Sequence, residues 1–229
     1  MSNSDYADIV DQVLAQIGKH VVLGLPLGLG KPNRLINAFY HRACQDSSIR
    51  LDIFTALSLN PPKAGSELEQ RFLQPFVKRH FGEDYPRLAY ADALAAQQLP
   101  ANITVTEFYF QSGSMLGNAD AQRHYVSSNY THVARDLADR GVNLILQLVA
   151  RRAGESGWQY SLSSNPDVTL DLAEELRHRP DKKCLIVAQV HPDLPFMAGD
   201  ALVGEGGGAR WLSLRCSRRG TPQFLATLY

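Results

Sequence analysis

The sequence predicts an α/β domain with an open, mainly parallel sheet and flanking helices. Three apolar runs, at residues 20–26, 142–150 and 184–190, have the length and composition of buried strands. Between them lie segments in which apolar residues recur at helical spacing. Residues 20–59 follow the order strand, glycine-rich turn, helix, strand, which is a βαβ crossover and therefore requires two parallel strands.

The first sixty residues supply the elements of that crossover. A helix is expected over 4–17 and ends at Gly18, and a strand follows at 20–26. The apolar face of this helix is Ile9, Val10, Val13, Leu14 and Ile17. Pro32 and Asn33 then open a second helix, and residues 49–59 form the second strand. The apolar stripe of the second helix is Leu35, Ile36, Phe39 and Ala43.

The rest of the chain continues the alternation of helices and strands. Ser66 and Glu69 have the spacing of a capping box before a helix near 67–79, in which Pro75 is expected to introduce a kink or break. Asn165, Pro166 and Asp167 have the composition of another helix start. The remaining expected elements are helices near 90–97, 128–140 and from Asn165 to Arg177, and strands at 103–110, 142–150, 158–164 and 184–190.

Composition is typical of a soluble globular domain with a sizeable core. Of the 229 residues, 45% are hydrophobic and 20% charged, and 23 basic residues balance 23 acidic ones. This balance indicates neither a nucleic-acid nor a membrane partner. Three cysteines, an odd number spread along the chain, argue against a disulfide framework and for a reducing compartment. Because the first twenty residues also lack a signal-peptide pattern, we expect a cytoplasmic protein.

The strongest chemical feature is the glycine-rich turn from Gly24 to Asn33, between a strand and a helix. Backbone N–H groups in such a turn, at a helix amino terminus, can approach an anion. The turn is not a Walker A loop, because Leu25 and Pro32 stand where that motif needs Gly and Ser or Thr. Asn33 likewise replaces the third glycine of the dinucleotide fingerprint. On spacing alone, an anion-binding loop and a tight turn without a ligand are equally well supported.

Other motifs carry less information. Ser114 lacks the Gly-x-Ser-x-Gly spacing of a hydrolase nucleophile, so a polar loop is the favoured interpretation. The seven histidines show no spacing typical of a metal site, and no metal is expected. Asn165 is interpreted equally well as a helix cap or as a substrate contact.

Five segments together resemble the amino-terminal domain of the acetyl-CoA hydrolase/transferase family. This family comprises class I CoA-transferases, including the 4-hydroxybutyrate and acetate enzymes. The segments that carry the likeness are 24–43, 51–62, 141–152, 160–172 and 187–201. The resemblance covers most of residues 20–203 and implies a CoA-transferase (NagB/RpiA-like) amino-terminal domain over residues 1–203.

The resemblance implies transfer of CoA between an acyl-CoA thioester and a carboxylate or water. The nucleophile in such enzymes is a glutamate of the carboxyl-terminal domain, so no catalytic residue is expected in this chain. An oxyanion-binding role is carried over to Gly28 and Gly30, with Pro32 and Asn33 shaping the helix start. Ser163 and Asn165 are weaker candidates for lining a carboxylate pocket. CoA or acyl-CoA is expected as a substrate, with no permanently bound cofactor.

The likeness ends near Val203, and residues 204–229 have a different character. From Gly206 onwards there are four arginines and no acidic residue. We interpret 204–229 as an atypical basic tail, either an ordinary surface tail or the product of out-of-frame translation. On this basis we expect that the glutamate-bearing half is absent and the chain is inactive alone.

Two partner expectations and two alternatives follow from this interpretation. A separate carboxyl-terminal subunit could supply the glutamate, and an uncovered domain interface would favour self-association. One alternative is a non-catalytic remnant or subunit that binds a small anion or a partner protein. The other is a relative of sugar-phosphate isomerases, which would need a carboxylate base near the glycine loop.

Overall fold

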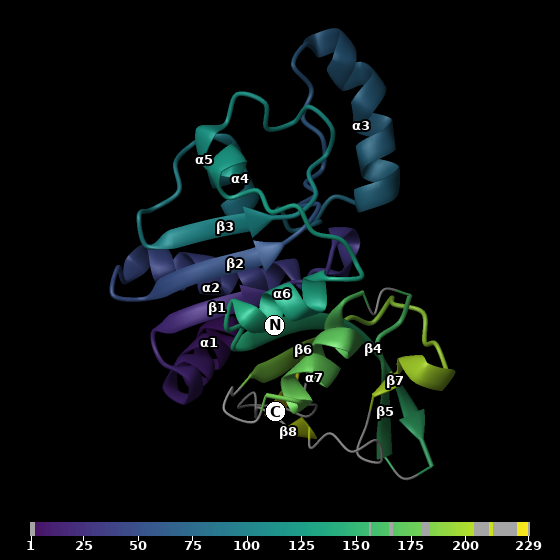
Figure 1. Ribbon diagram of the computed structural model, residues 1–229. Coiled ribbons are helices and arrows are strands. Elements are labelled where there is room, and N and C mark those ends of the chain that lie inside the picture. The colour runs from purple at the N-terminus through teal and green to yellow at the C-terminus, as the bar shows by residue number, and fades with distance from the viewer. Residues whose placement is uncertain are drawn as a thin grey trace.

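The computed structural model describes residues 3–155, 157–164, 167–179, 184–203, 211–212 and 224–228. They form an α/β domain around one open sheet (Figure 1), as the sequence predicts. The parallel strands lie in the order β3 (Ile103–Glu107), β2 (Arg50–Thr55), β1 (His20–Gly24), β4 (Leu144–Gly154) and β6 (Leu185–Val190). The predicted βαβ crossover is therefore confirmed, since β1 and β2 pair in parallel from His20↔Arg50 to Gly24↔Phe54.

Helices cover both faces of the sheet because successive side chains of a strand point to opposite sides. Val21 and Leu23 of β1 join the core cluster beneath α1 (Asn3–Ile17) and α2 (Asn33–Gln45). Val22 joins the cluster on the other face, beneath α6 (Val133–Asp139) and α7 (Thr169–Arg177). Continuous apolar strands are thus explained by burial on both faces. None of the described helices is long and apolar enough to cross a membrane.

Smaller elements extend the sheet and its edges. An antiparallel strand, β5 (Gly157–Ser161), pairs with the end of β4, and β7 (Leu202–Val203) pairs with β5. Within residues 204–229 the structure describes two strands, β8 (Trp211–Leu212) and β9 (Phe224–Leu228). β9 pairs antiparallel with β6, and the four arginines of this segment lie outside the described residues. Two short 3₁₀ helices, η1 (Gly28–Gly30) and η2 (Gly199–Ala201), complete the loops.

The remaining helices are α3 (Glu67–Phe81), α4 (Ala89–Ala95) and α5 (Ala119–Arg123). The Ser66 hydroxyl caps α3 by accepting from the Glu69 N–H at 3.2 Å, which confirms the predicted start. The carboxylate of Glu69 accepts from Gly65 rather than from Ser66, so the box is only half formed as predicted. Pro75 lies inside the helix, which continues through it to Phe81.

Several predicted boundaries are wrong for local reasons. The second strand ends at Thr55 rather than at residue 59, because Leu57 has the left-handed φ of 49°. The predicted helix over 128–140 is confined to 133–139. The helix expected from Asn165 begins instead at Thr169, and Asp167, with φ of 48°, is used in a contact with the glycine loop. Asn165 and Pro166 themselves lie outside the described residues.

The two-sided burial of the central strands predicts where the fold is most sensitive. Leu144 of β4 is fully buried, so Leu144→Ala should lower the free energy of unfolding by about 2–5 kcal/mol, because it leaves a cavity in the core. Urea denaturation measures this change. Leu116→Ala is the control, since Leu116 is 80% exposed and its loss should cost less than about 0.5 kcal/mol. Equal losses in the two variants would contradict the assigned core.

Candidate functional site

The glycine loop lies at the point where the sheet changes its direction of growth. From β1 the chain adds β2 and β3 on one side, and later places β4 and β6 on the other side. In open parallel sheets, ligands bind in the crevice outside the carboxyl ends of the strands at such a point. The loop connects the carboxyl end of β1 to α2, which begins at Asn33 as predicted, with Pro32 as its N-cap. The fold therefore places the loop where a ligand is expected.

Backbone geometry in the loop explains part of its composition. Gly28 has φ of 53°, in the left-handed region that a residue with a side chain rarely adopts. The N–H of Leu27 donates to Oδ2 of Asp167 at 2.5 Å, so a loop amide already faces a carboxylate of the protein itself. The N–H of Gly30 donates to the carbonyl of Leu27 at 3.3 Å. Because the Gly30 amide is already hydrogen-bonded within the loop, the oxyanion contact expected from the sequence depends more on the Gly28 amide than on that of Gly30.

A buried lysine and two carboxyl groups lie beneath the loop. Lys31 is 2% exposed, and its Nζ donates to the carbonyl oxygens of Ala56 at 2.7 Å and Leu57 at 3.4 Å. Glu107, at the end of β3, is 1% exposed and accepts from the N–H of Ser58 at 3.3 Å. These contacts join the loops that follow β1, β2 and β3 at one edge of the sheet.

Burial shifts the protonation equilibria of this cluster. It lowers the pKa of Lys31 to about 7, although the charges of Glu107 and Asp167 oppose the shift. Burial likewise raises the pKa of Glu107, against its hydrogen bonds from Ser58 and the charge of Lys31. It also raises the pKa of Asp167, against the hydrogen bond from Leu27. Among the described residues, Oε1 of Glu107 and Oδ1 of Asp167 are buried without a hydrogen-bond partner.

Sequence reasoning did not identify this cluster. Glu107 is the last residue of the alternating segment ITVTE (103–107). An acidic residue at the carboxyl end of a buried strand is the one sequence signal that could have indicated a site residue here. Asp167 is interpreted from sequence as a first-turn helix residue, and Lys31 as part of a failed Walker motif. Only the tertiary fold brings the three together.

A pocket of about 400 Å³ adjoins the start of α2, beside the middle of β4 and the carboxyl end of β6. Its lining includes three basic residues, Lys31, Arg34 and His191, and two acidic ones, Asp84 and Asp193. Gln189 of β6 also lines it, and the Oε1 atom of this side chain is buried without a partner among the described residues. A pocket with this lining can hold a small polar molecule next to the helix amino terminus.

The other residues predicted for the site have structural contacts. Nδ2 of Asn33 donates to the carbonyl of Pro86 at 2.8 Å and to the hydroxyl of Tyr85 at 3.2 Å, so Asn33 fixes a wall of this pocket. Ser163, with φ of 61°, is buried and its hydroxyl donates to the carbonyl of Pro195 at 2.8 Å. Asn165 lies outside the described residues. No group of three or more metal-ligating side chains gathers within the described part of the chain.

Solved structures of RipA have a similar fold. RipA from Yersinia pestis aligns with 89% of this chain and 42% of its own, at 16% identity and a TM-score of 0.50. One variant of RipA aligns at 17% identity and a TM-score of 0.53. At this identity the likeness shows the fold alone, and the chain spans about two fifths of the RipA chains it matches.

A 4-hydroxybutyrate CoA-transferase from Porphyromonas gingivalis also aligns, over 86% of this chain and 35% of its own, at 16% identity. Its TM-score of 0.43 supports no conclusion. Neither a protein-family profile nor a curated protein sequence matches the chain.

The buried lysine makes a prediction about pH. Between pH 7 and about 10, the unfolded chain holds a proton on Lys31 that the folded chain has released, so this residue makes the fold more stable as pH rises. Lys31→Met removes that effect and also the positive charge that favours ionised Glu107. The free energy of unfolding of the wild type, minus that of Lys31→Met, should therefore increase with pH between 7 and 9. The increase is at most about 1.4 kcal/mol per pH unit for the one Lys31 proton.

Urea denaturation at pH 6, 7, 8 and 9 measures that difference. The matched control is Lys63→Met, because the Lys63 side chain is 70% exposed and its ion pair with Asp92 lies at the surface. A difference for Lys31→Met that stays constant over this range would contradict the assigned burial of its ammonium group.

Proposed function

We propose that the chain is the amino-terminal half of a CoA-transferase or acetyl-CoA hydrolase, which moves CoA between an acyl-CoA thioester and a small carboxylate or water. The observation that carries this proposal is the loop amide of Leu27 holding a carboxylate, that of Asp167, at the switch point of the sheet. This contact supports the proposal that backbone amides of the glycine loop can bind a negatively charged group. The resemblance of five sequence segments to CoA-transferases supplies the reaction class.

The proposed chemistry divides between two polypeptide segments. A glutamate from the carboxyl-terminal half attacks the thioester carbonyl, forming an acyl anhydride and releasing the CoA thiolate. The thiolate then attacks the glutamyl carbonyl of the anhydride, giving a glutamyl-CoA thioester and releasing the acyl group as a free carboxylate. This chain contributes the amide of Gly28 toward the oxyanion that develops on the carbonyl oxygen. Arg34 and His191 at the pocket attract the carboxylate substrate, and Asn33 keeps the pocket wall in place. Ser163 and Asn165 remain weaker candidates for that carboxylate pocket.

The buried cluster is assigned a positioning role in this proposal. Lys31 ties the loop to the segment after β2, and Asp167 ties it to the segment before α7. An amide acts on a transition state only if it is held in place before the reaction. The chain itself is proposed to bind CoA and a small carboxylate as substrates, without a permanent cofactor, in the cytoplasm.

The second candidate function is binding of a small anion or partner without catalysis. The observation that favours it is the pocket beside α2, because binding a ligand there requires no nucleophile.

The isomerase alternative requires a carboxylate base near the loop, and Asp167 meets the requirement of position. Its Oδ2 atom is engaged by the loop amide and its Oδ1 atom is buried, however, so neither oxygen faces an external substrate.

The chain alone should not turn over acetyl-CoA, because the nucleophile lies outside it. Adding a glutamate-bearing carboxyl-terminal half as a separate polypeptide should restore transfer of CoA to acetate or water. Release of the free thiol and formation of the new thioester measure the two outcomes. Turnover by the chain alone at ordinary enzymic rates would contradict the proposal, and saturable acetate binding without any turnover by the pair would favour the anion-binding alternative.

Gly28→Ala should lower turnover by the reconstituted pair roughly 10–100-fold, because the strained backbone moves the oxyanion donor. Gly18→Ala is the matched control, since Gly18 also has a left-handed φ, of 82°, but lies at the end of α1. This control should lose stability and keep turnover per folded molecule. Equal losses of turnover in the two variants would exclude a role for the loop.

A further inference from the structure

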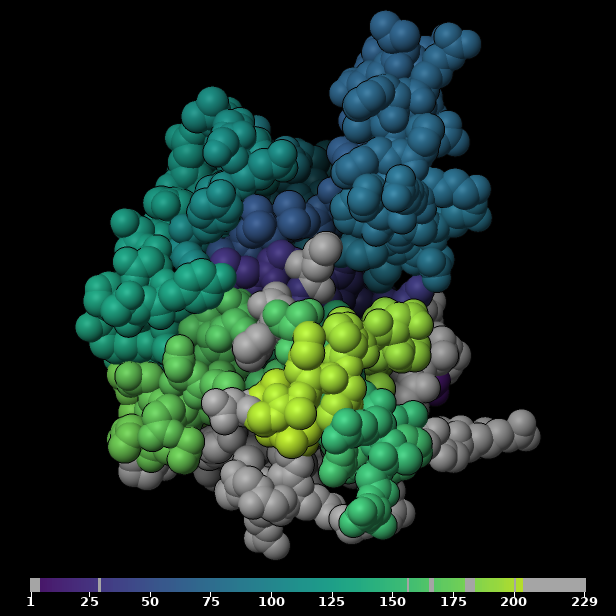
Figure 2. All heavy atoms as spheres, turned by 90° about the vertical axis from the view of Figure 1, so that its right-hand side faces the viewer, coloured from purple at the N-terminus to yellow at the C-terminus, as the bar shows by residue number. Residues whose placement is uncertain are grey.

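Helix α3 stands away from the body of the domain (Figure 1, Figure 2). No residue of α3, all fifteen of which the structure describes, is buried. Its outer face carries Leu68, Phe72 and Phe76, which are 78%, 80% and 47% exposed. Because these residues are four apart, they form one apolar stripe along the helix. Such a stripe of large apolar side chains is typical of an interaction surface.

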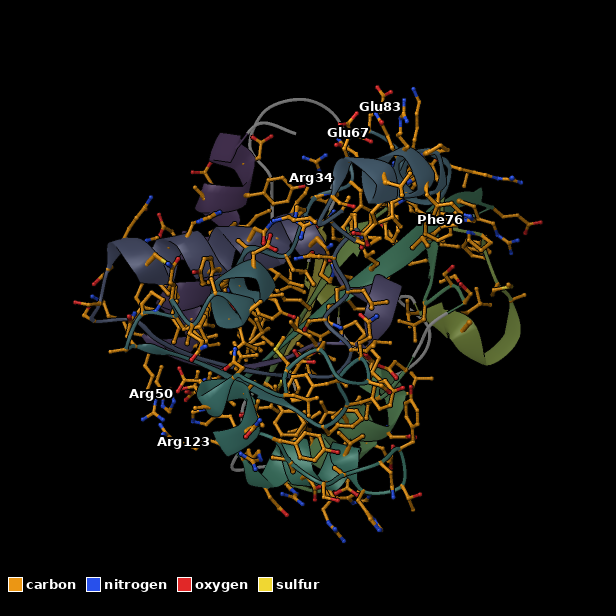
Figure 3. The ribbon with its side chains drawn as sticks, turned by 90° about the horizontal axis from the view of Figure 1, so that it is seen from above. Arg34, Arg50, Glu67, Phe76, Glu83 and Arg123 are labelled. Carbon is orange, nitrogen blue, oxygen red and sulfur yellow. The ribbon has the colours of Figure 1, made fainter. Side chains whose placement is uncertain are left out.

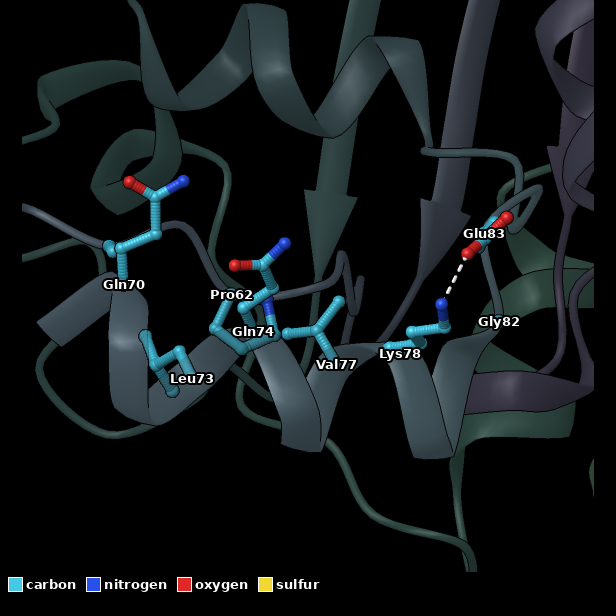
Figure 4. A pocket seen from close by; sticks show the side chains of 9 residues that line it. Pro62, Gln70, Leu73, Gln74, Val77, Lys78, Gly82 and Glu83 are labelled. Carbon is cyan, nitrogen blue, oxygen red and sulfur yellow. Dashed lines mark ion pairs between the residues drawn. The ribbon is translucent and has the colours of Figure 1, made fainter. Parts of the chain in front are cut away.

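The inner face of α3 borders a groove, and both ends of the helix are capped. Leu73 and Val77 face a groove of about 370 Å³ that Pro62 also lines (Figure 4). Ser66 caps the first turn, and the N–H of Gly82 donates to the carbonyl of Lys78 at 3.1 Å after the last turn. The helix is thus capped at both ends, and its outer stripe is exposed, with the Phe76 ring packed only against His80 of the same helix, at 4.4 Å between centroids, among the ring contacts of the described residues.

Charge is distributed along α3 in opposite signs. Glu67 and Glu69 lie in the first turn, and Lys78, Arg79 and His80 lie in the last turn. Glu69 comes three residues before Phe72, and Arg79 comes three residues after Phe76, so the two charges border the stripe at its two ends. Figure 3 shows Glu67 and Phe76 on this projecting helix.

This order of charges and rings is self-complementary in one direction only. If two α3 helices lie antiparallel about a two-fold axis near residue 74, Phe72 of one faces Phe76 of the other. Glu69 then faces Arg79 at both ends of the pair. A parallel pair would instead place acid against acid and base against base. A two-fold contact that uses the same patch on both copies is the commonest form of self-association.

We propose that α3 is the contact between two copies of this chain, paired antiparallel along the stripe Leu68, Phe72 and Phe76. Burial of the stripe drives the association, and the Glu69–Arg79 pairs set its direction, since exposed ion pairs contribute little energy by themselves. The contact is small, so association is weak and depends on concentration. This assignment does not depend on the CoA-transferase proposal, because it uses neither the glycine loop nor the pocket beside it.

Sedimentation velocity of the whole chain over a range of concentrations tests the surface. The wild type should show a monomer–dimer equilibrium, and Phe72→Glu should weaken it at least tenfold, because charge enters the apolar contact. Leu116→Glu, which alters an equally exposed leucine elsewhere, is the matched control and should leave it unchanged. Circular dichroism confirms that each variant is folded. A monomeric wild type at all concentrations, or equal weakening by the control, would overturn the proposal.

Charge exchange tests the direction of the pair. Glu69→Arg and Arg79→Glu should each weaken the homodimer, because each places like charges together at both ends. A 1:1 mixture of these two variants should form a heterodimer, and the double variant should associate like the wild type. Single variants that associate as the wild type does would overturn the antiparallel arrangement, since a parallel pair keeps like charges together in every one of these proteins.

Discussion

The buried Nζ group of Lys31 is the contact on which the carboxyl edge of this domain depends. It extends from the glycine loop and donates to the carbonyl oxygens of Ala56 and Leu57, which follow β2. Those carbonyl groups end the second strand, where Leu57 adopts a left-handed conformation. Burial favours the neutral form of this amine, and the charges of Glu107 and Asp167 oppose that shift. The positions of the glycine loop and of the segment after β2 are therefore linked through one side chain.

The same edge of the sheet carries buried polar atoms without hydrogen-bond partners among the described residues. Oxygen atoms of Glu107, Asp167 and Gln189 are buried without partners among the described residues. Such atoms lower stability wherever they occur, and they are common at functional sites. Gln189 lines the pocket and Asp167 contacts the glycine loop, so two of the three lie where a ligand is proposed. The stability cost is thus concentrated beside the proposed binding site.

The fold was predictable from the sequence because its strands are buried on both faces. Residues 20–26, 142–150 and 184–190 carry continuous apolar runs. The first and third contain β1 and β6, and the second overlaps β4, which continues to Gly154. The site was predictable only in part. The glycine loop follows from local sequence, whereas Glu107 and Asp167 act through tertiary contacts that no local pattern records. The predicted helix start at Asn165 was wrong for the same reason, since Asp167 is used to bind the loop amide instead of beginning a helix.

The central claim is that the loop after β1 binds negative charge next to Gly28, and titration of the isotope-labelled chain with acetate tests it most directly. The amide signals of Gly28 and Asn33 and the ring signals of His191 should shift together and saturate with one binding constant. Shifts that do not saturate, or that occur only far from this edge of the sheet, would contradict the claim.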